Sequence, residues 1–147
     1  MAVIGVGDEQ ALGIQAARQL RVTCPPQARL FVGELSASCE ELVGLLRAFA
    51  PDLIVLIDAV PMQCAPGAIR YWGWQDTSGL SGSQPTWPPH EIAGCLIDEL
   101  GCEAALIGIQ PDEGANNAPL SAEVRRAVEE VAQALRQALT MSQPVSG

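Results

Sequence analysis

The sequence contains no lysine: its eight basic residues are all arginines, and its formal net charge is −9. Binding to nucleic acid or to an anionic membrane surface needs a basic stripe. The only arginines that adjoin each other are Arg125 and Arg126, so we expect neither partner. No apolar run approaches the roughly 20 residues that a bilayer-spanning helix needs. No transmembrane segment is therefore predicted.

Cysteine pairs at the spacing of a metal or redox motif are also missing. The five cysteines, at positions 24, 39, 64, 95 and 102, include no CxxC motif. Their odd number, and the absence of a basic region in the opening MAVIGVGDEQ, argue against a secreted disulfide framework. We expect thiols in or near the core, a cytoplasmic location, and a single domain over residues 1–147.

Apolar runs and helical periodicity alternate along the chain. Strands are predicted over 2–7, 28–34, 53–59, 68–74 and 103–111, and helices over 9–22, 38–50, 90–101 and 121–139. The strands are apolar without alternation, which is typical of a parallel sheet covered on both faces. The sequence therefore predicts an α/β fold: a three-layer α/β/α sandwich around a mostly parallel, twisted sheet of about five strands.

Local signals sharpen several of these boundaries. Residues 53–59 form the most apolar strand, which we place at the centre of the sheet. Ser121 is a predicted N-cap of the last helix, and Gly101 a predicted C-terminal stop of the preceding one. Residues 75–89 are rich in glycine, serine and proline and are predicted to form a long loop, a type of segment that is often functional.

Polar groups follow three of the predicted elements at one edge of the sheet. The first strand ends in GVGDEQ, the central strand ends at Asp58, and the long loop ends at His90, the only histidine. Ligands of parallel α/β sheets bind beyond the carboxyl ends of the strands. Taken singly, Asp58 could be a cap or an ion-pair partner and His90 an exposed residue. Together they predict a site with two carboxylates and an imidazole, which suits zinc or nickel.

Two other kinds of site fit the sequence less well. Gly5 and Gly7 lie between a strand and a helix, as in a dinucleotide-binding turn, and Glu34 could contact a ribose. The next glycine is Gly13, however, so GxGxxG is absent and this interpretation is not favoured. A serine or cysteine hydrolase is disfavoured too, because there is no GxSxG and a single histidine would have to serve every nucleophile.

The order of several motifs resembles a known family. These motifs are VIGVG at the start, LIVLIDAV followed by APGAIR, a loop ending in PPH, the stretch ALIGIQP, and LSAEVRRAVEEVAQAL near the end. In this order and spacing they resemble the hydrogenase maturation endopeptidases, and the last two look most similar to the branch that serves the formate-linked hydrogenase. The resemblance covers nearly the whole chain.

The resemblance implies a metal-binding site with named residues. Its acid at the end of the central strand falls on Asp58, and its histidine after the variable loop falls on His90. Its first ligand, an acid after the first strand, falls on Glu9 if the acidic pair is matched, or on Gln10 if the helix start ALG is matched. We favour Glu9, because a neutral amide is a poorer ligand. The implied metal is nickel, supplied by the substrate, although other divalent ions could occupy the site.

The function that the resemblance implies is a nickel-dependent, aspartic-type endopeptidase, whose partner is the precursor of a nickel–iron hydrogenase large subunit. Glu9, Asp58 and His90 would be its catalytic residues, and the chain would act as a monomer. Trp87 could shape the surface that receives the substrate, whereas Trp72 and Trp74 are expected only to pack. The first loop is shorter than in the family, so a non-cleaving homologue that binds the hydrogenase subunit is one alternative. A nucleotide- or small-ligand-binding protein is another.

Overall fold

The computed structural model describes residues 1–8, 10–25, 28–35, 40–84, 87–113 and 119–141. Its strands are β1 (Ala2–Val6), β2 (Phe31–Leu35), β3 (Leu53–Ala59), β4 (Ile69–Gly73) and β5 (Glu103–Ile109). Its helices are α1 (Leu12–Thr23), α2 (Glu40–Phe49), α3 (Pro89–Leu100) and α4 (Ala122–Met141), with a short 3-10 helix at Trp74–Asp76. Every predicted element is present within these residues.

The five strands form one sheet in the order β2-β1-β3-β5-β4. All neighbouring strands are parallel except β4, which runs antiparallel to β5 at one edge. Strand β3 is central, as its apolar sequence predicts, and its five inner residues are all buried. The carboxyl ends of β1, β3 and β5 therefore open on the same edge of the sheet.

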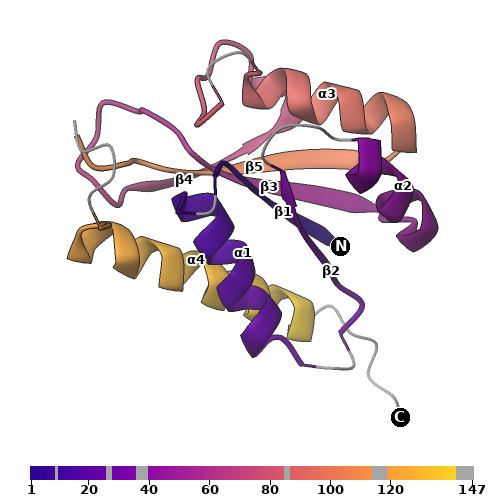
Figure 1. Cartoon of the computed structure of the whole chain (residues 1–147), viewed down its shortest axis with the longest axis horizontal. Helices are drawn as coiled ribbons and strands as arrows, with labels where there is room; N and C mark the ends of the chain where they lie inside the picture. Colours follow the sequence, from indigo (N-terminus) through magenta and orange to yellow (C-terminus); the bar gives the residue numbers. More distant parts are fainter. Residues whose placement is uncertain (9, 26–27, 36–39, 85–86, 114–118, 142–147) are drawn as a thin grey trace.

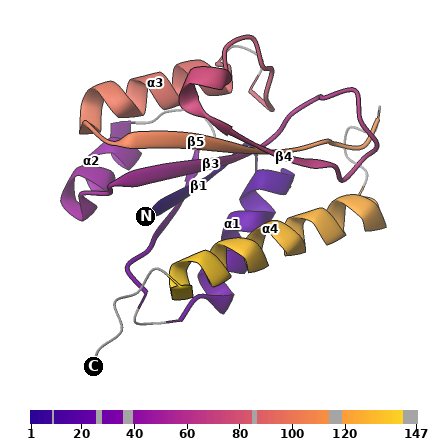
Figure 2. The same cartoon turned by 180° about the vertical axis from the view of Figure 1, so that it is seen from behind.

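Helices cover both faces of the sheet, which gives the predicted three layers. Figure 1 shows α1 and α4 side by side on one face and α2 and α3 on the other, and Figure 2 shows the same arrangement from behind. Each face has its own apolar core, one built around Ile4, Leu56 and Leu96 and the other around Leu20, Ile57 and Val128. Within the described ranges, no helix is both long and apolar enough to pass through a bilayer.

Two predicted boundaries are wrong because of local turns. Helix α1 begins at Leu12 rather than near residue 9, because the Ala11 amide donates to the Asp8 carbonyl in a preceding turn. Strand β2 begins at Phe31 rather than at 28, because the Ala28 amide donates to the Pro25 carbonyl. The predicted caps are confirmed: Gly101 has a φ of 65°, and the Ser121 hydroxyl accepts a bond from the Val124 amide at 3.3 Å.

The start of α1 approaches the sheet very closely. A Cβ atom on Gly13 would lie 2.1 Å from the Ile57 carbonyl oxygen, and one on Gly5 would lie 2.4 Å from the Gly13 carbonyl oxygen. Only glycine fits at either position, so the helix packs backbone against backbone on β1 and β3. Gly13 thus has the close-packing role that the sequence pattern did not assign to it.

Candidate functional site at the carboxyl edge of the sheet

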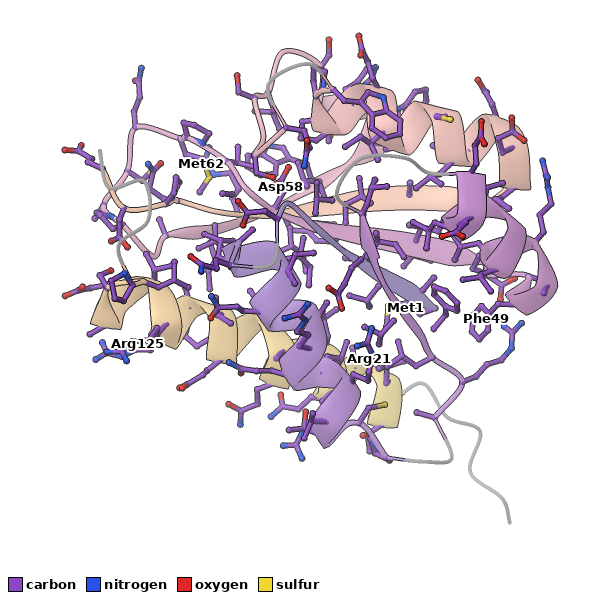
Figure 3. All side chains as sticks on the ribbon, in the orientation of Figure 1. Met1, Arg21, Phe49, Asp58, Met62 and Arg125 are labelled. Atoms are coloured by element: carbon purple, nitrogen blue, oxygen red, sulfur yellow. The ribbon has the colours of Figure 1, made fainter. Side chains whose placement is uncertain are left out.

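Asp58 lies at the end of the central strand, with a side chain that is only 1% exposed. Its Oδ1 atom accepts hydrogen bonds from the Ala59 amide at 2.8 Å and from the Ser83 amide at 3.1 Å, and its Oδ2 atom lies 3.2 Å from the same Ser83 nitrogen. Figure 3 shows Asp58 beneath the loop that leads to α3. The carboxylate is therefore held by backbone donors and shielded from solvent.

Burial makes Asp58 a weaker acid than an exposed aspartate. Desolvation raises its pKa from 3.8 to about 6, and the hydrogen bonds from Ser83 and Ala59 partly offset the rise. Since the two states of a carboxyl group with such a pKa both occur near neutral pH, Asp58 is suited to exchange a proton or to bind a cation there. The cost of burying its charge is thus only partly compensated within the chain.

Gly82 connects Asp58 with the start of α3. A Cβ atom on Gly82 would lie 2.2 Å from the Asp58 Oδ2 atom and 2.9 Å from Cγ of Pro89, the residue that precedes His90. The adjacent Ser83 hydroxyl donates to the Val6 carbonyl at the end of β1, at 3.4 Å. The ends of β1 and β3 and the start of α3 therefore meet at residues 82–83, which we call the covering segment.

His90 is the second residue of α3, and three contacts hold it. Its Nδ1 atom lies 2.8 Å from the Thr77 Oγ1 atom, and its ring stacks on Trp74 with a centroid distance of 5.0 Å and an interplanar angle of 8°. The Trp74 indole N–H also donates to the His90 carbonyl at 3.0 Å. Sequence reasoning missed Thr77 and assigned Trp74 to packing alone, because no local motif links residues 74–77 with residue 90.

The structure leaves the first predicted ligand position open. Glu9 lies outside the described residues. Gln10 is exposed. Its backbone amide donates to the Asp8 carboxylate at 3.0 Å, and its backbone carbonyl accepts a bond from the Gln15 side-chain amide at 2.9 Å. Among the residues that the structure describes, no three His, Cys, Asp or Glu side chains are grouped closely enough to hold a metal ion.

Of the predicted ligands, the structure therefore describes Asp58, a buried carboxylate, and His90, an imidazole held by Thr77 and Trp74. This donor set suits a borderline divalent ion, provided that further ligands come from Glu9 or from the substrate.

Two further expectations concern cysteine and tryptophan. Cys24, Cys95 and Cys102 are partly buried, but Cys64 is exposed, so its predicted place in or near the core is wrong. Cys39 lies outside the described residues. Cys64 follows β3 in the connection to β4, where the chain runs over the surface and its thiol donates to the Met62 carbonyl at 3.4 Å. Trp87 is half-buried against the apolar core that contains Ile4, Leu56 and Leu96, and a role in receiving substrate stays a prediction.

No family model matches the sequence, and no curated relative matches it. Several solved structures, however, are similar to the chain. The [NiFe] hydrogenase maturation protease HycI from Thermococcus kodakarensis superposes with a TM-score of 0.77 at 23% identity, over 95% of this chain and 91% of that one. The chain has the fold of the hydrogenase maturation proteases.

Other structures of the same kind agree with this assignment. The endopeptidase HycI from Escherichia coli superposes with a TM-score of 0.71 at 24% identity, over 92% of this chain and 88% of that one. The hydrogenase maturating endopeptidase HybD from E. coli superposes with a TM-score of 0.64 at 18% identity, over 96% and 92%. The likeness extends over nearly the full length of each chain, so the fold that the sequence resemblance implied is confirmed.

Proposed function

We propose that the chain is an endopeptidase of hydrogenase maturation, which acts in the cytoplasm as a monomer. Its substrate would be the nickel-loaded large-subunit precursor of a nickel–iron hydrogenase, from which it removes a C-terminal extension. The observation that carries the proposal is the junction at Gly82, where the Asp58 carboxylate meets the start of the helix that bears His90. The shared fold of the maturation proteases supports it.

In this proposal Asp58, His90 and Glu9 bind the nickel ion that arrives with the precursor. When bound, a divalent ion of this kind polarises a carbonyl group or a water molecule. Nickel belongs to the substrate here, so recognition would depend on a precursor that already carries its metal. Other divalent ions can use the same carboxylate and imidazole donors.

The chain's own residues prepare the site for this role. Above its pKa of about 6, the Asp58 carboxyl group is mostly ionised, which both a metal ligand and a proton acceptor require. The Ala59 and Ser83 amides fix the direction of the carboxylate. Because Asp58 is almost fully enclosed, the covering segment has to move away before substrate can reach it. Hydrolysis then adds one water across the scissile bond and releases the extension.

A second candidate is a binding module that recognises the hydrogenase subunit without cleaving it. The enclosed state of Asp58, with both oxygens already near the Ser83 amide, favours this alternative. If Gln10 rather than Glu9 took the first ligand position, the site would lose one negative charge, and this loss would further favour the binding module. The two candidates share a partner and differ in turnover.

A cleavage assay separates the candidates. The purified chain is incubated with the nickel-loaded precursor and with the same precursor lacking nickel, and the precursor is followed by intact mass. We expect the loss of one discrete C-terminal peptide, only with nickel and not with the Asp58→Ala variant. Binding without a mass change would favour the binding module. The absence of both binding and cleavage would refute both candidates.

A further inference from the structure

Thr77 lies between two polar atoms that compete for its single hydroxyl proton. Its Oγ1 atom lies 2.6 Å from the Trp74 carbonyl oxygen and 2.8 Å from Nδ1 of His90. The side chain is buried, with 1% exposed, so solvent cannot replace either partner. If the Thr77 hydroxyl donates its proton to the Trp74 carbonyl, it can only accept from His90, so the direction of this bond decides whether Nδ1 of the imidazole carries a proton.

The chemistry of the two partners settles this choice. A carbonyl oxygen can only accept a hydrogen bond, whereas a ring nitrogen can accept or donate. Without a proton between them, the Thr77 and Trp74 oxygens would meet at 2.6 Å with lone pairs facing each other. The hydroxyl therefore donates to Trp74, and a bond with His90 at 2.8 Å requires that Nδ1 carries a proton and donates it to Thr77.

We infer that Thr77 is a positioning residue that holds His90 in the Nδ1–H tautomer and leaves the lone pair of Nε2 free. Histidine in water prefers the opposite tautomer, with the proton on Nε2. The tautomer of a ring is set by the hydrogen bond that its other nitrogen makes. At this site a threonine hydroxyl makes that bond, and its orientation is fixed in turn by the Trp74 carbonyl.

Further contacts keep the ring from turning away. The Trp74 indole stacks on the imidazole and donates to the His90 carbonyl, so one side chain contacts both the ring and the backbone of His90. The Thr77 amide also donates to the Trp74 carbonyl at 3.1 Å, which closes the 3-10 turn. Pro88 and Pro89 restrict the backbone where α3 begins. The ring is thus fixed in tautomer, plane and position before any ligand arrives.

This inference deepens the proposed function, on which its biological meaning rests. Only an unprotonated nitrogen binds a metal ion, and groups that orient a ligating histidine commonly contribute 10- to 100-fold in metal affinity or activity. Preparing Nε2 in advance spares the cost of moving a proton and turning the ring when the precursor docks. The tautomer itself can be measured without substrate or metal.

The experiment uses the fact that His90 is the only histidine in the chain. The full-length protein is labelled with 15N at histidine and examined by two-dimensional proton–nitrogen NMR, at a pH well above the ordinary imidazole pKa of about 6.5. A single ring contributes signals, and its coupling pattern shows which nitrogen is protonated. We expect a protonated Nδ1 and an unprotonated Nε2. A predominantly Nε2–H ring in the wild-type protein would overturn the inference.

Two variants test the part played by Thr77. Thr77→Ser keeps the hydroxyl and is expected to keep the Nδ1–H tautomer. Thr77→Val keeps the shape but removes the hydroxyl, so we expect the ring to shift toward the Nε2–H form, with the fold verified by the backbone amide spectrum. An unchanged tautomer in folded Thr77→Val would refute the role of Thr77. The wild-type spectrum remains decisive if the valine variant does not fold.

Precursor cleavage provides a separate readout. We expect Thr77→Val to lower the cleavage rate about 10- to 100-fold and Thr77→Ser to retain most of it. A rate loss in Thr77→Val without a tautomer change would refute the positioning role. An Nδ1–H ring in a wild-type protein that neither binds nor cleaves the precursor would refute the proposed function and leave the tautomer assignment standing.

Discussion

The backbone amide of Ser83 lies 3.1 Å from one carboxylate oxygen of Asp58 and 3.2 Å from the other. This contact closes the covering segment over a buried acid whose pKa is raised to about 6. Since the hydrogen bonds do not fully offset the loss of hydration, the ionised carboxylate destabilises the folded protein. A buried and incompletely compensated charge at the end of a central strand is the kind of feature that a protein retains for function rather than for stability.

The stability of the protein should depend on pH through Asp58. The pKa of the Asp58 carboxyl group is about 6 in the folded protein and 3.8 for an ordinary exposed aspartate, as in the unfolded chain. Between these two pH values the folded protein therefore binds more protons than the unfolded one. The free energy of unfolding therefore falls as pH rises through this window. By pH 7 the loss is about 3 kcal/mol. Urea unfolding curves recorded at a series of pH values across this range should show the fall in the free energy of unfolding.

Asp58→Asn removes the titrating group and keeps an oxygen that can accept the Ala59 and Ser83 bonds. We expect it to increase the free energy of unfolding above pH 6 and to change it little near pH 4. Asp98→Asn, which removes an exposed carboxylate from α3, is the matched control and should leave the profile unchanged. An equal effect of Asp58→Asn at every pH would show that the raised pKa of Asp58 is not the source of the pH dependence.

Gly82 is expected to be indispensable for closing the covering segment. In Gly82→Ala the new methyl group would overlap the Asp58 carboxylate and crowd the Pro89 ring, so the segment must shift and the Ser83 bonds weaken. We expect a loss of about 1–3 kcal/mol in the free energy of unfolding. Urea denaturation at neutral pH measures it.

Gly44→Ala is the matched control, because Gly44 lies in α2 with nothing within 4 Å of an added Cβ atom. Alanine is the better helix former, so we expect that variant to gain roughly 0.5–1 kcal/mol. Equal stability of the two variants would show that the covering segment does not pack on Asp58 in solution.

Much of the fold could be predicted because its signals are local. The run IVLI marks β3 as a buried central strand, Gly101 supplies the left-handed residue that ends α3, and Ser121 caps α4. Asp58 and His90 could also be singled out, since parallel strands bring their carboxyl ends to one edge. These inferences need only short stretches of sequence and the geometry of a parallel sheet.

The remaining features depend on contacts between distant segments. Thr77 meets His90 only because the 3-10 helix folds back on the start of α3, and Ser83 meets Asp58 across 25 positions of the chain. The antiparallel direction of β4 likewise follows from its pairing with β5 and not from its own residues. No periodicity or motif records such relationships, because the side chains involved are ordinary polar residues in an irregular loop.

His90 is expected to be essential for cleavage and dispensable for folding. His90→Ala removes the imidazole donor but leaves α3 and its proline start intact, so the protein should stay folded while precursor cleavage falls by more than about 100-fold. Glu91→Ala, which removes the exposed neighbouring side chain, is the control and should cleave at the wild-type rate. Initial rates by intact mass, with folding verified by circular dichroism, make the comparison. Undiminished cleavage by His90→Ala would exclude the imidazole from the site.

The first ligand position can be assigned by a pair of substitutions in the turn before α1. If Glu9 provides the acid, Glu9→Gln replaces a charged oxygen donor by a neutral amide of nearly the same shape, and we expect cleavage of the nickel-loaded precursor to fall at least about 10-fold. Gln10 is exposed and contributes its backbone to the turn, so Gln10→Ala should leave the rate unchanged. The reverse pattern would move the ligand position to Gln10. A third result, in which neither substitution alters the rate, would mean that Asp58 and His90 bind the substrate metal without an acid from this turn.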